Sequence, residues 1–81
     1  MARVSGQRDS EGRLAQVGAA VRLRRKEFGL SQEALADAAG IDRSHMGKIE
    51  RGERNVSLLN VIKIAAVLEW KPSDLLAAAG L

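Results

Sequence analysis

The side chains best suited to recognition chemistry lie between Ser31 and Glu50, where three polar residues occur at helical spacing. Arg43, Ser44 and Lys48 stand at i, i+1 and i+5, so a helix would carry them on its outer face and at its leading end. Arginine and lysine can donate hydrogen bonds to guanine O6 and N7, and arginine can do so through two bonds at once. This pattern indicates base recognition in a DNA major groove.

Two short helices joined by a tight turn must position these side chains. Gly40 marks the turn because glycine adopts positive φ without steric cost. Ala36, four residues earlier, is small enough to let the helices cross closely. The inner, apolar sides of the two helices are supplied by Leu35, Ile41, Met46 and Ile49. The segment is therefore predicted to form a helix-turn-helix whose second helix is the recognition helix.

The ordered set of motifs resembles the Cro/C1 (xenobiotic-response-element type) family of helix-turn-helix regulators. Gly29-Leu30-Ser31-Gln32 is similar to the family's entry into the second helix, and Ile49-Glu50-Arg51-Gly52 to its exit from the recognition helix. The resemblance runs from about Gly18 to Leu76. It implies an all-α fold, a compact five-helix bundle of the lambda-repressor-like DNA-binding type.

Composition is consistent with one small helical domain. The chain has 81 residues, and its only aromatic residues are Phe28 and Trp70, so Leu, Ile, Val and Ala must build the core. It has no cysteine and no apolar run near the ~18 residues needed to span a membrane. These features favour a cytoplasmic bacterial or phage protein associated with the nucleoid. The net charge of +3 is small, but basic residues cluster around 22–26 and 43–54, a distribution that suits contacts with DNA phosphates.

We expect a flexible N-terminal arm at residues 1–12 and a DNA-binding and dimerisation domain at residues 13–81. Apolar spacing and capping residues predict helices at about 13–28, 32–39, 43–51, 58–68 and 72–79. Ser31, Asp42 and Ser57 are the expected N-caps, and Pro72 suits the first turn of the last helix. Arg3 and Arg8 could let the arm touch DNA.

The DNA contacts divide into two classes. Base contacts are expected from Arg43, Ser44, Lys48, His45 and Arg54, although His45 is equally well explained as an exposed helical residue. Phosphate contacts are expected from Gln32, Arg51, Asn55 and Ser57; the resemblance implies this role for Gln32 and for the residues after the recognition helix. Gly47 either keeps a side chain out of the groove or allows close packing against the preceding helix, and the first reading is slightly favoured.

Glu50 opposes the dipole at a helix C-terminus and removes positive charge from a DNA-facing element. The resemblance implies a partner for it, an arginine four residues before Gly-Leu-Ser-Gln, which is Arg25. We therefore expect a structural ion pair between the first and third helices.

The fourth helix carries more apolar residues than one core can cover. One stripe consists of Leu58, Val61, Ile64, Ala65 and Leu68. A second line on another face, Leu59, Ile62 and Ala66, continues toward Trp70 and is predicted to form a dimer interface, extended by Leu75, Leu76 or Leu81. The alternative is packing by the fifth helix alone.

Enzymatic function is not expected, because the chain has one histidine, no cysteine, no paired carboxylates placed for catalysis and no phosphate-cradling glycine loop. No metal, cofactor or small-molecule substrate is expected. The favoured hypothesis is a homodimeric regulator that binds double-stranded DNA at a pseudo-palindromic operator. Asp42-Arg43-Ser44 and the segment from Glu50 to Ser57 look like controller proteins of restriction–modification systems, which regulate their own operon and the endonuclease gene. The alternatives are a phage-type repressor and an antitoxin with a helix-turn-helix.

Overall fold

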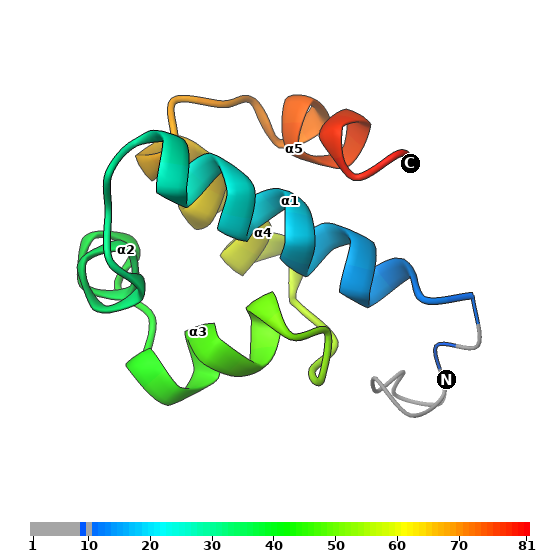
Figure 1. Cartoon of the computed structure of the whole chain (residues 1–81), viewed down its shortest axis with the longest axis horizontal. Coiled ribbons are helices and arrows are strands. Elements are labelled where there is room, and N and C mark those ends of the chain that lie inside the picture. The colour runs from blue at the N-terminus through cyan, green and yellow to red at the C-terminus, as the bar shows by residue number, and fades with distance from the viewer. Residues whose placement is uncertain (1–8, 10) are drawn as a thin grey trace.

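The computed structural model describes Asp9 and residues 11–81, and in that part of the chain it contains five α-helices and no strand. Figure 1 shows α1 crossing the middle of the molecule, with α5 on one side and α3 on the other. The helices are α1 (Arg13–Glu27), α2 (Gln32–Ala39), α3 (Arg43–Glu50), α4 (Leu58–Val67) and α5 (Pro72–Ala78). The predicted all-α, five-helix fold is confirmed. Most of the expected arm, residues 1–8 and 10, lies outside the described residues.

Side chains fix the starts of three helices. Ser31 Oγ accepts a hydrogen bond from the amide of Ala34 at α2, and Ser57 Oγ accepts one from Asn60 at α4. The Asp42 carboxylate accepts from the first-turn amides of α3, and Pro72 is the first residue of α5. Each oxygen satisfies a backbone N–H that has no partner inside the helix. Gly40, with φ of 68°, ends α2 and opens the turn into α3.

The core lies where α2 and α4 meet and where α1 packs on α3 and α5. Leu35 and Ala36 of α2 are completely buried, so the helices of the turn cross as closely as the small side chain at position 36 allows. The largest buried side chains come from all five helices or the residues that flank them: Val21, Leu35, Met46, Ile49, Ile64, Leu68 and Leu75. None of the described helices is long and apolar enough to cross a lipid bilayer.

Two expectations about apolar residues were wrong. Leu58 was assigned to the core stripe of α4, but its side chain is 71 % exposed because it occupies the first turn of the helix and the buried stripe begins only at Val61. Leu75 was one candidate for the dimer interface, but it is fully buried in the core, where it fills the contact between α5 and its neighbours.

Candidate nucleic-acid interface

The outer face of α3 presents the polar residues that the sequence assigned to base contacts. Arg43 and Ser44 are exposed at its first turn, while His45 and Lys48 are partly exposed. Met46 and Ile49 point inward and are buried. The helix is therefore anchored by one side. Its other side is accessible, as in a helix that lies in a DNA major groove.

The two exposed residues at the start of α3 already have partners. An Arg43 guanidinium nitrogen lies 3.6 Å from a Glu33 carboxylate oxygen, and both side chains are largely exposed. Such a surface pair is weak, so Arg43 can exchange Glu33 for a base or a phosphate at little cost. The Ser44 hydroxyl donates to Asp42, and this hydrogen bond is the main reason that the pKa of Asp42 lies below its ordinary value.

A buried polar network joins α1, α2 and α3. Arg25 Nε donates to Glu50 Oε2 at 2.8 Å and a terminal nitrogen donates to Oε1 at 3.0 Å, so the expected ion pair is present and has two hydrogen bonds. Gln32 Nε2 donates to the same Oε1 at 3.2 Å, and the other terminal nitrogen of Arg25 donates to the carbonyl of Leu30. The Glu50 side chain is only 2 % exposed, which makes these partners necessary.

Two glycines that sequence reasoning passed over bring α1 against the end of α3. A Cβ placed on Gly18 would stand 2.4 Å from the carbonyl oxygen of Glu50, and one on Gly52 would stand 2.6 Å from the Cα of Ala15. Both distances are to backbone, which cannot give way. For Gly18 the signal in the sequence was a glycine inside a predicted helix, which costs helix stability and so calls for a packing reason. Gly52 lies in the loop after α3 and has a positive φ of 72°, which glycine adopts without steric cost.

Gly47 has a different environment. It is buried, and a Cβ there would lie 3.1 Å from a guanidinium nitrogen of Arg51 and 3.2 Å from the amide oxygen of Gln32. The neighbours are the ends of flexible side chains, one of them at the start of α2. This arrangement supports close packing against the preceding helix rather than the groove-facing role expected from the sequence.

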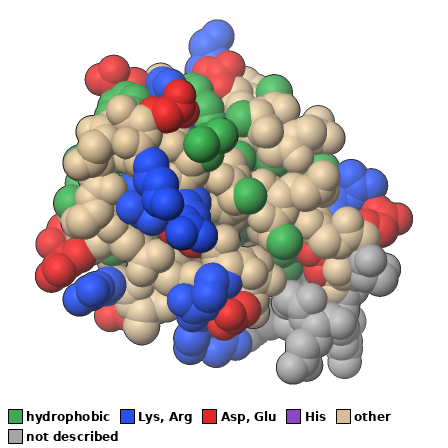
Figure 2. Space-filling view, in the orientation of Figure 1, with side chains coloured by type: hydrophobic (Ala, Val, Ile, Leu, Met, Phe, Trp, Pro, Cys, Tyr) green, Lys and Arg blue, Asp and Glu red, His purple; other side chains and the backbone are tan. Residues whose placement is uncertain are grey.

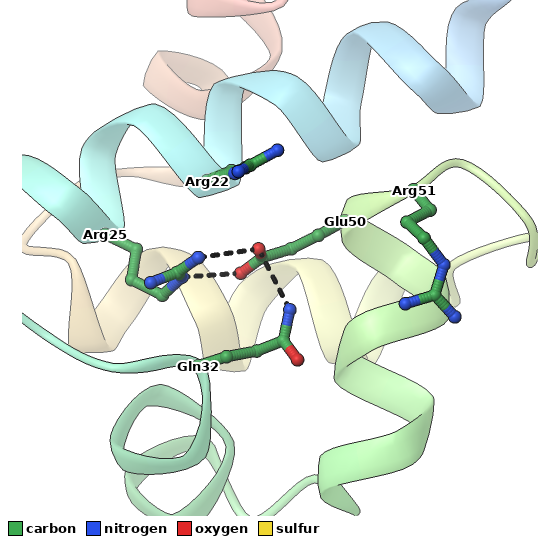
Figure 3. Close-up of a pocket in the computed structure, with 5 residues that line it drawn as sticks. All are labelled: Arg22, Arg25, Gln32, Glu50 and Arg51. Carbon is green, nitrogen blue, oxygen red and sulfur yellow. Dashed lines mark hydrogen bonds and ion pairs between the residues drawn. The ribbon is translucent and has the colours of Figure 1, made fainter.

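Five side chains line a hollow of about 210 Å³ between α1, α2 and α3, shown in Figure 3. Arg22 and Arg25 reach it from α1, Gln32 from α2, and Glu50 and Arg51 from the end of α3. The sequence assigned phosphate contacts to Gln32 and Arg51 but gave Arg22 no individual role. Its position three residues before Arg25 places both on one face of α1, and that spacing was the available signal.

The loop after α3 is exposed and highly charged. Arg51 donates to the Glu53 carboxylate through Nε at 2.7 Å and through a terminal nitrogen at 3.4 Å. These hydrogen bonds lower the pKa of Glu53 and raise that of Arg51. Arg54 and Asn55 are exposed, whereas Ser57 acts as the α4 cap, as expected.

The face seen in Figure 2 carries several cationic side chains. Figure 2 shows Lys and Arg over the middle and lower part of the face on which α1 and α3 lie in Figure 1, with carboxylates between them. No group of three potential metal ligands occurs in the described part of the chain.

The side chains assigned to the dimer interface fall into two groups. Leu59, Ile62, Ala66 and Leu76 are exposed, with Leu59 at 60 % and Ile62 at 43 %, and Leu81 is exposed as well. Trp70 is partly buried against the core, and the Arg24 guanidinium lies 4.8 Å from its ring centroid. We call Leu59, Ile62, Ala66 and Leu76 the apolar face.

Comparison with known proteins shows the family. The helix-turn-helix family model matches residues 21–76. Over 61 residues the chain is 43 % identical to the control protein C.SmaI of Serratia marcescens, a match that covers 75 % of this chain and 73 % of that relative. The structure is similar to the restriction–modification controller protein C.AhdI from Aeromonas hydrophila, with a TM-score of 0.75, 48 % identity and coverage of 76 % and 94 % of the two chains. It is also similar to SinR, the master regulator for biofilm formation, in complex with DNA, with a TM-score of 0.70, 36 % identity and coverage of 74 % and 97 %.

Proposed function

Because this chain belongs to the helix-turn-helix family of DNA-binding transcription regulators, we propose that it is a restriction–modification controller protein that binds a pseudo-palindromic operator as a homodimer. The observation that carries the proposal is the exposed polar face of α3, held on a scaffold that is 48 % identical to a controller protein over 76 % of this chain. On this proposal the operator lies in its own operon and controls the endonuclease gene.

Base readout is assigned to the first turns of α3. Arg43 and Lys48 donate to guanine edges, Ser44 and His45 make adjacent contacts, and Arg54 reaches a base edge from the following loop. Two features support this assignment. The Arg43 side chain is exposed with only a weak carboxylate partner, and the family includes a member solved in complex with DNA.

Phosphate contacts position the recognition helix. We assign contacts with the DNA backbone on either side of the recognition helix to four residues: Gln32 at the start of α2, Arg51 at the end of α3, and Asn55 and Ser57 before α4. Arg51 exchanges Glu53 for a phosphate oxygen when DNA arrives, which the exposure of the pair allows.

The homodimer is assigned to the apolar face. Two exposed leucines and an isoleucine on adjoining helices are costly to leave in water, and a second copy of the chain can cover them by two-fold symmetry. Trp70, which is partly buried against the core, is assigned to the same interface. Two recognition helices related in this way would meet half-sites about 34–36 Å apart.

The base-contact assignment is tested by Arg43→Ala. After selection of the preferred duplex from a random library, we expect the variant to lose about 1–3 kcal/mol of binding free energy on that duplex and to relax preference at one base pair per half-site. Lys71→Ala, an exposed change just before α5 and away from every assigned contact, is the control and should leave both unchanged. Competition with single-base variants of the duplex is the measurement; an unchanged preference in Arg43→Ala would remove its role.

A further inference from the structure

The hollow in Figure 3 contains one cation that the fold does not use. All three guanidinium nitrogens of Arg25 donate hydrogen bonds, two to the Glu50 carboxylate and one to the Leu30 carbonyl. Glu50 also accepts a hydrogen bond from Gln32. Arg22, one turn earlier on α1, makes no ion pair within 4 Å in the described part of the chain. Its charge therefore neutralises nothing inside the protein.

The wall of the hollow is suited to an oxyanion. Three guanidinium groups and a side-chain amide surround a single carboxylate whose two oxygens are already bonded, so the site keeps a net positive charge. Arg51 uses Nε and one terminal nitrogen on Glu53, and its other terminal nitrogen lies on the Gly47 side, beside Gln32. Polar side chains from α1, α2 and the end of α3 thus line one opening.

From this geometry we propose that the hollow binds one phosphate of the DNA backbone and that Arg22 is a phosphate-contacting residue alongside Gln32 and Arg51. The inference rests on the proposed DNA-binding function. Arg22, Gln32 and Arg51 line the same hollow, so a phosphate held there by Gln32 and Arg51 has Arg22 as a further lining donor. The first helix then takes part in DNA binding directly, and it clamps the backbone against the buried Arg25–Glu50 pair.

The test compares Arg22→Gln with Lys26→Gln. Both residues are exposed on α1, one turn apart, and both changes remove one charge, but Lys26 does not line the hollow. Binding of a mixed-sequence duplex and of the library-selected duplex is measured by fluorescence anisotropy over a range of salt concentrations. The slope of log K against log salt should fall by about 1 per bound protomer in Arg22→Gln, and by clearly less in Lys26→Gln. Both duplexes should lose affinity equally, because the contact carries no sequence information.

The phosphate itself is located by replacing single phosphates of the selected duplex with neutral methylphosphonates. The wild-type protein should lose affinity at several positions, and in Arg22→Gln the loss at one of these positions should disappear. A purely structural effect of the substitution would leave every one of these losses in place. Retention of all of them, or equal slopes for the two variants, would overturn the inference.

Two controls separate the possible failures. If the wild-type protein binds no duplex, the proposed function itself fails. If it binds DNA, inorganic phosphate is titrated into the free protein while the Gln32 side-chain amide is followed by NMR. Phosphate binding that Arg22→Gln abolishes, together with an unchanged DNA salt slope, would assign the hollow to a free anion and contradict a backbone contact.

Discussion

Two regions differ in whether one chain completes their contacts: the α1–α3 junction, formed around Arg25 and Glu50, and the apolar face. At the junction, both oxygens of the buried Glu50 carboxylate accept hydrogen bonds from Arg25, and Gln32 adds a third. Glycines bring the backbones together there. On α4, by contrast, Leu59 and Ile62 remain exposed although the core side of the same helix is covered by the rest of the chain. A polar site completed within one chain fixes the geometry of α3, whereas the apolar face stays exposed in one chain and is covered by a second copy only on the proposed function.

The largest expected effect is the loss of one partner at the junction. Arg25→Ala leaves Glu50 buried with only Gln32, and we expect the free energy of unfolding to fall by about 3–5 kcal/mol. Glu50→Ala should cost a similar amount because Arg25 is left without its carboxylate. The double variant should be milder than the sum of the single changes in a thermal-melt cycle. Near-zero, additive losses would mean that the pair contributes nothing to holding α1 on α3.

The glycine contact gives a second way to break the junction. Gly18→Ala forces a methyl group against the backbone of Glu50, and overpacking of this kind costs about 1–3 kcal/mol. Gly47→Ala is the matched control, because it meets only flexible side-chain ends and gains helix propensity, so stability should be unchanged or up to about 1 kcal/mol higher. Chemical denaturation measures both. Equal stabilities would contradict the close approach of α1 and α3.

The exposed N-terminal end of α3 should respond to pH. The Ser44 hydroxyl and first-turn amides lower the pKa of Asp42 in the folded state, so its stabilising effect is present above the unfolded-state pKa. That effect is lost as the pH falls through the lower, folded-state pKa. Asp42→Asn keeps a capping oxygen that does not titrate. As the pH falls, the wild type should therefore lose more stability than Asp42→Asn, and thermal melts over a pH series measure this difference. If both proteins lose stability in parallel, the charge of Asp42 does not stabilise α3.

The smallest effect concerns the turn between α4 and α5. Glu69 is the non-glycine residue with positive φ, at 57°, in the described chain. This conformation is strained for a residue with a Cβ. Glu69→Gly should raise the free energy of unfolding by roughly 0.5–1 kcal/mol without changing the oligomeric state. Denaturant titration and sedimentation check the two parts; a loss of stability would show that the side chain has a role outside the turn.

Local signals made most of the fold predictable. Ser31, Asp42 and Ser57 are short polar residues before apolar periodic segments, and each begins a helix as expected. Pro72 likewise begins α5. The Arg25–Glu50 pair followed from the family pattern, because a carboxylate at a helix C-terminus needs a partner that local sequence does not supply. Periodicity nevertheless misplaced Leu58, which is exposed, and one dimer candidate, Leu75, which is buried. Apolar spacing predicts which way a side chain points from its helix, but not which parts of that helix the neighbouring helices cover.

The rest of the candidate site depends on distances across the fold. Gly18 meets the carbonyl of Glu50 only because α1 and α3 cross at that point. The third bond to Glu50, from Gln32, likewise joins residues 18 positions apart. Arg22 becomes notable only when its neighbour Arg25 is seen to be fully bonded. None of these contacts is a property of helix propensity or apolar spacing.

The most direct test of the homodimeric regulator is sedimentation of the wild type, Ile62→Glu and Ser73→Glu over micromolar concentrations, free and bound to the selected duplex. Ile62→Glu places a charge in the apolar face, while Ser73→Glu adds the same charge at an exposed position of α5. We predict that wild type and Ser73→Glu are dimers and that Ile62→Glu is a folded monomer with steeply reduced operator affinity, since two half-sites are no longer linked. A wild type that stays monomeric both free and on DNA, or an Ile62→Glu variant that still dimerises, would contradict it.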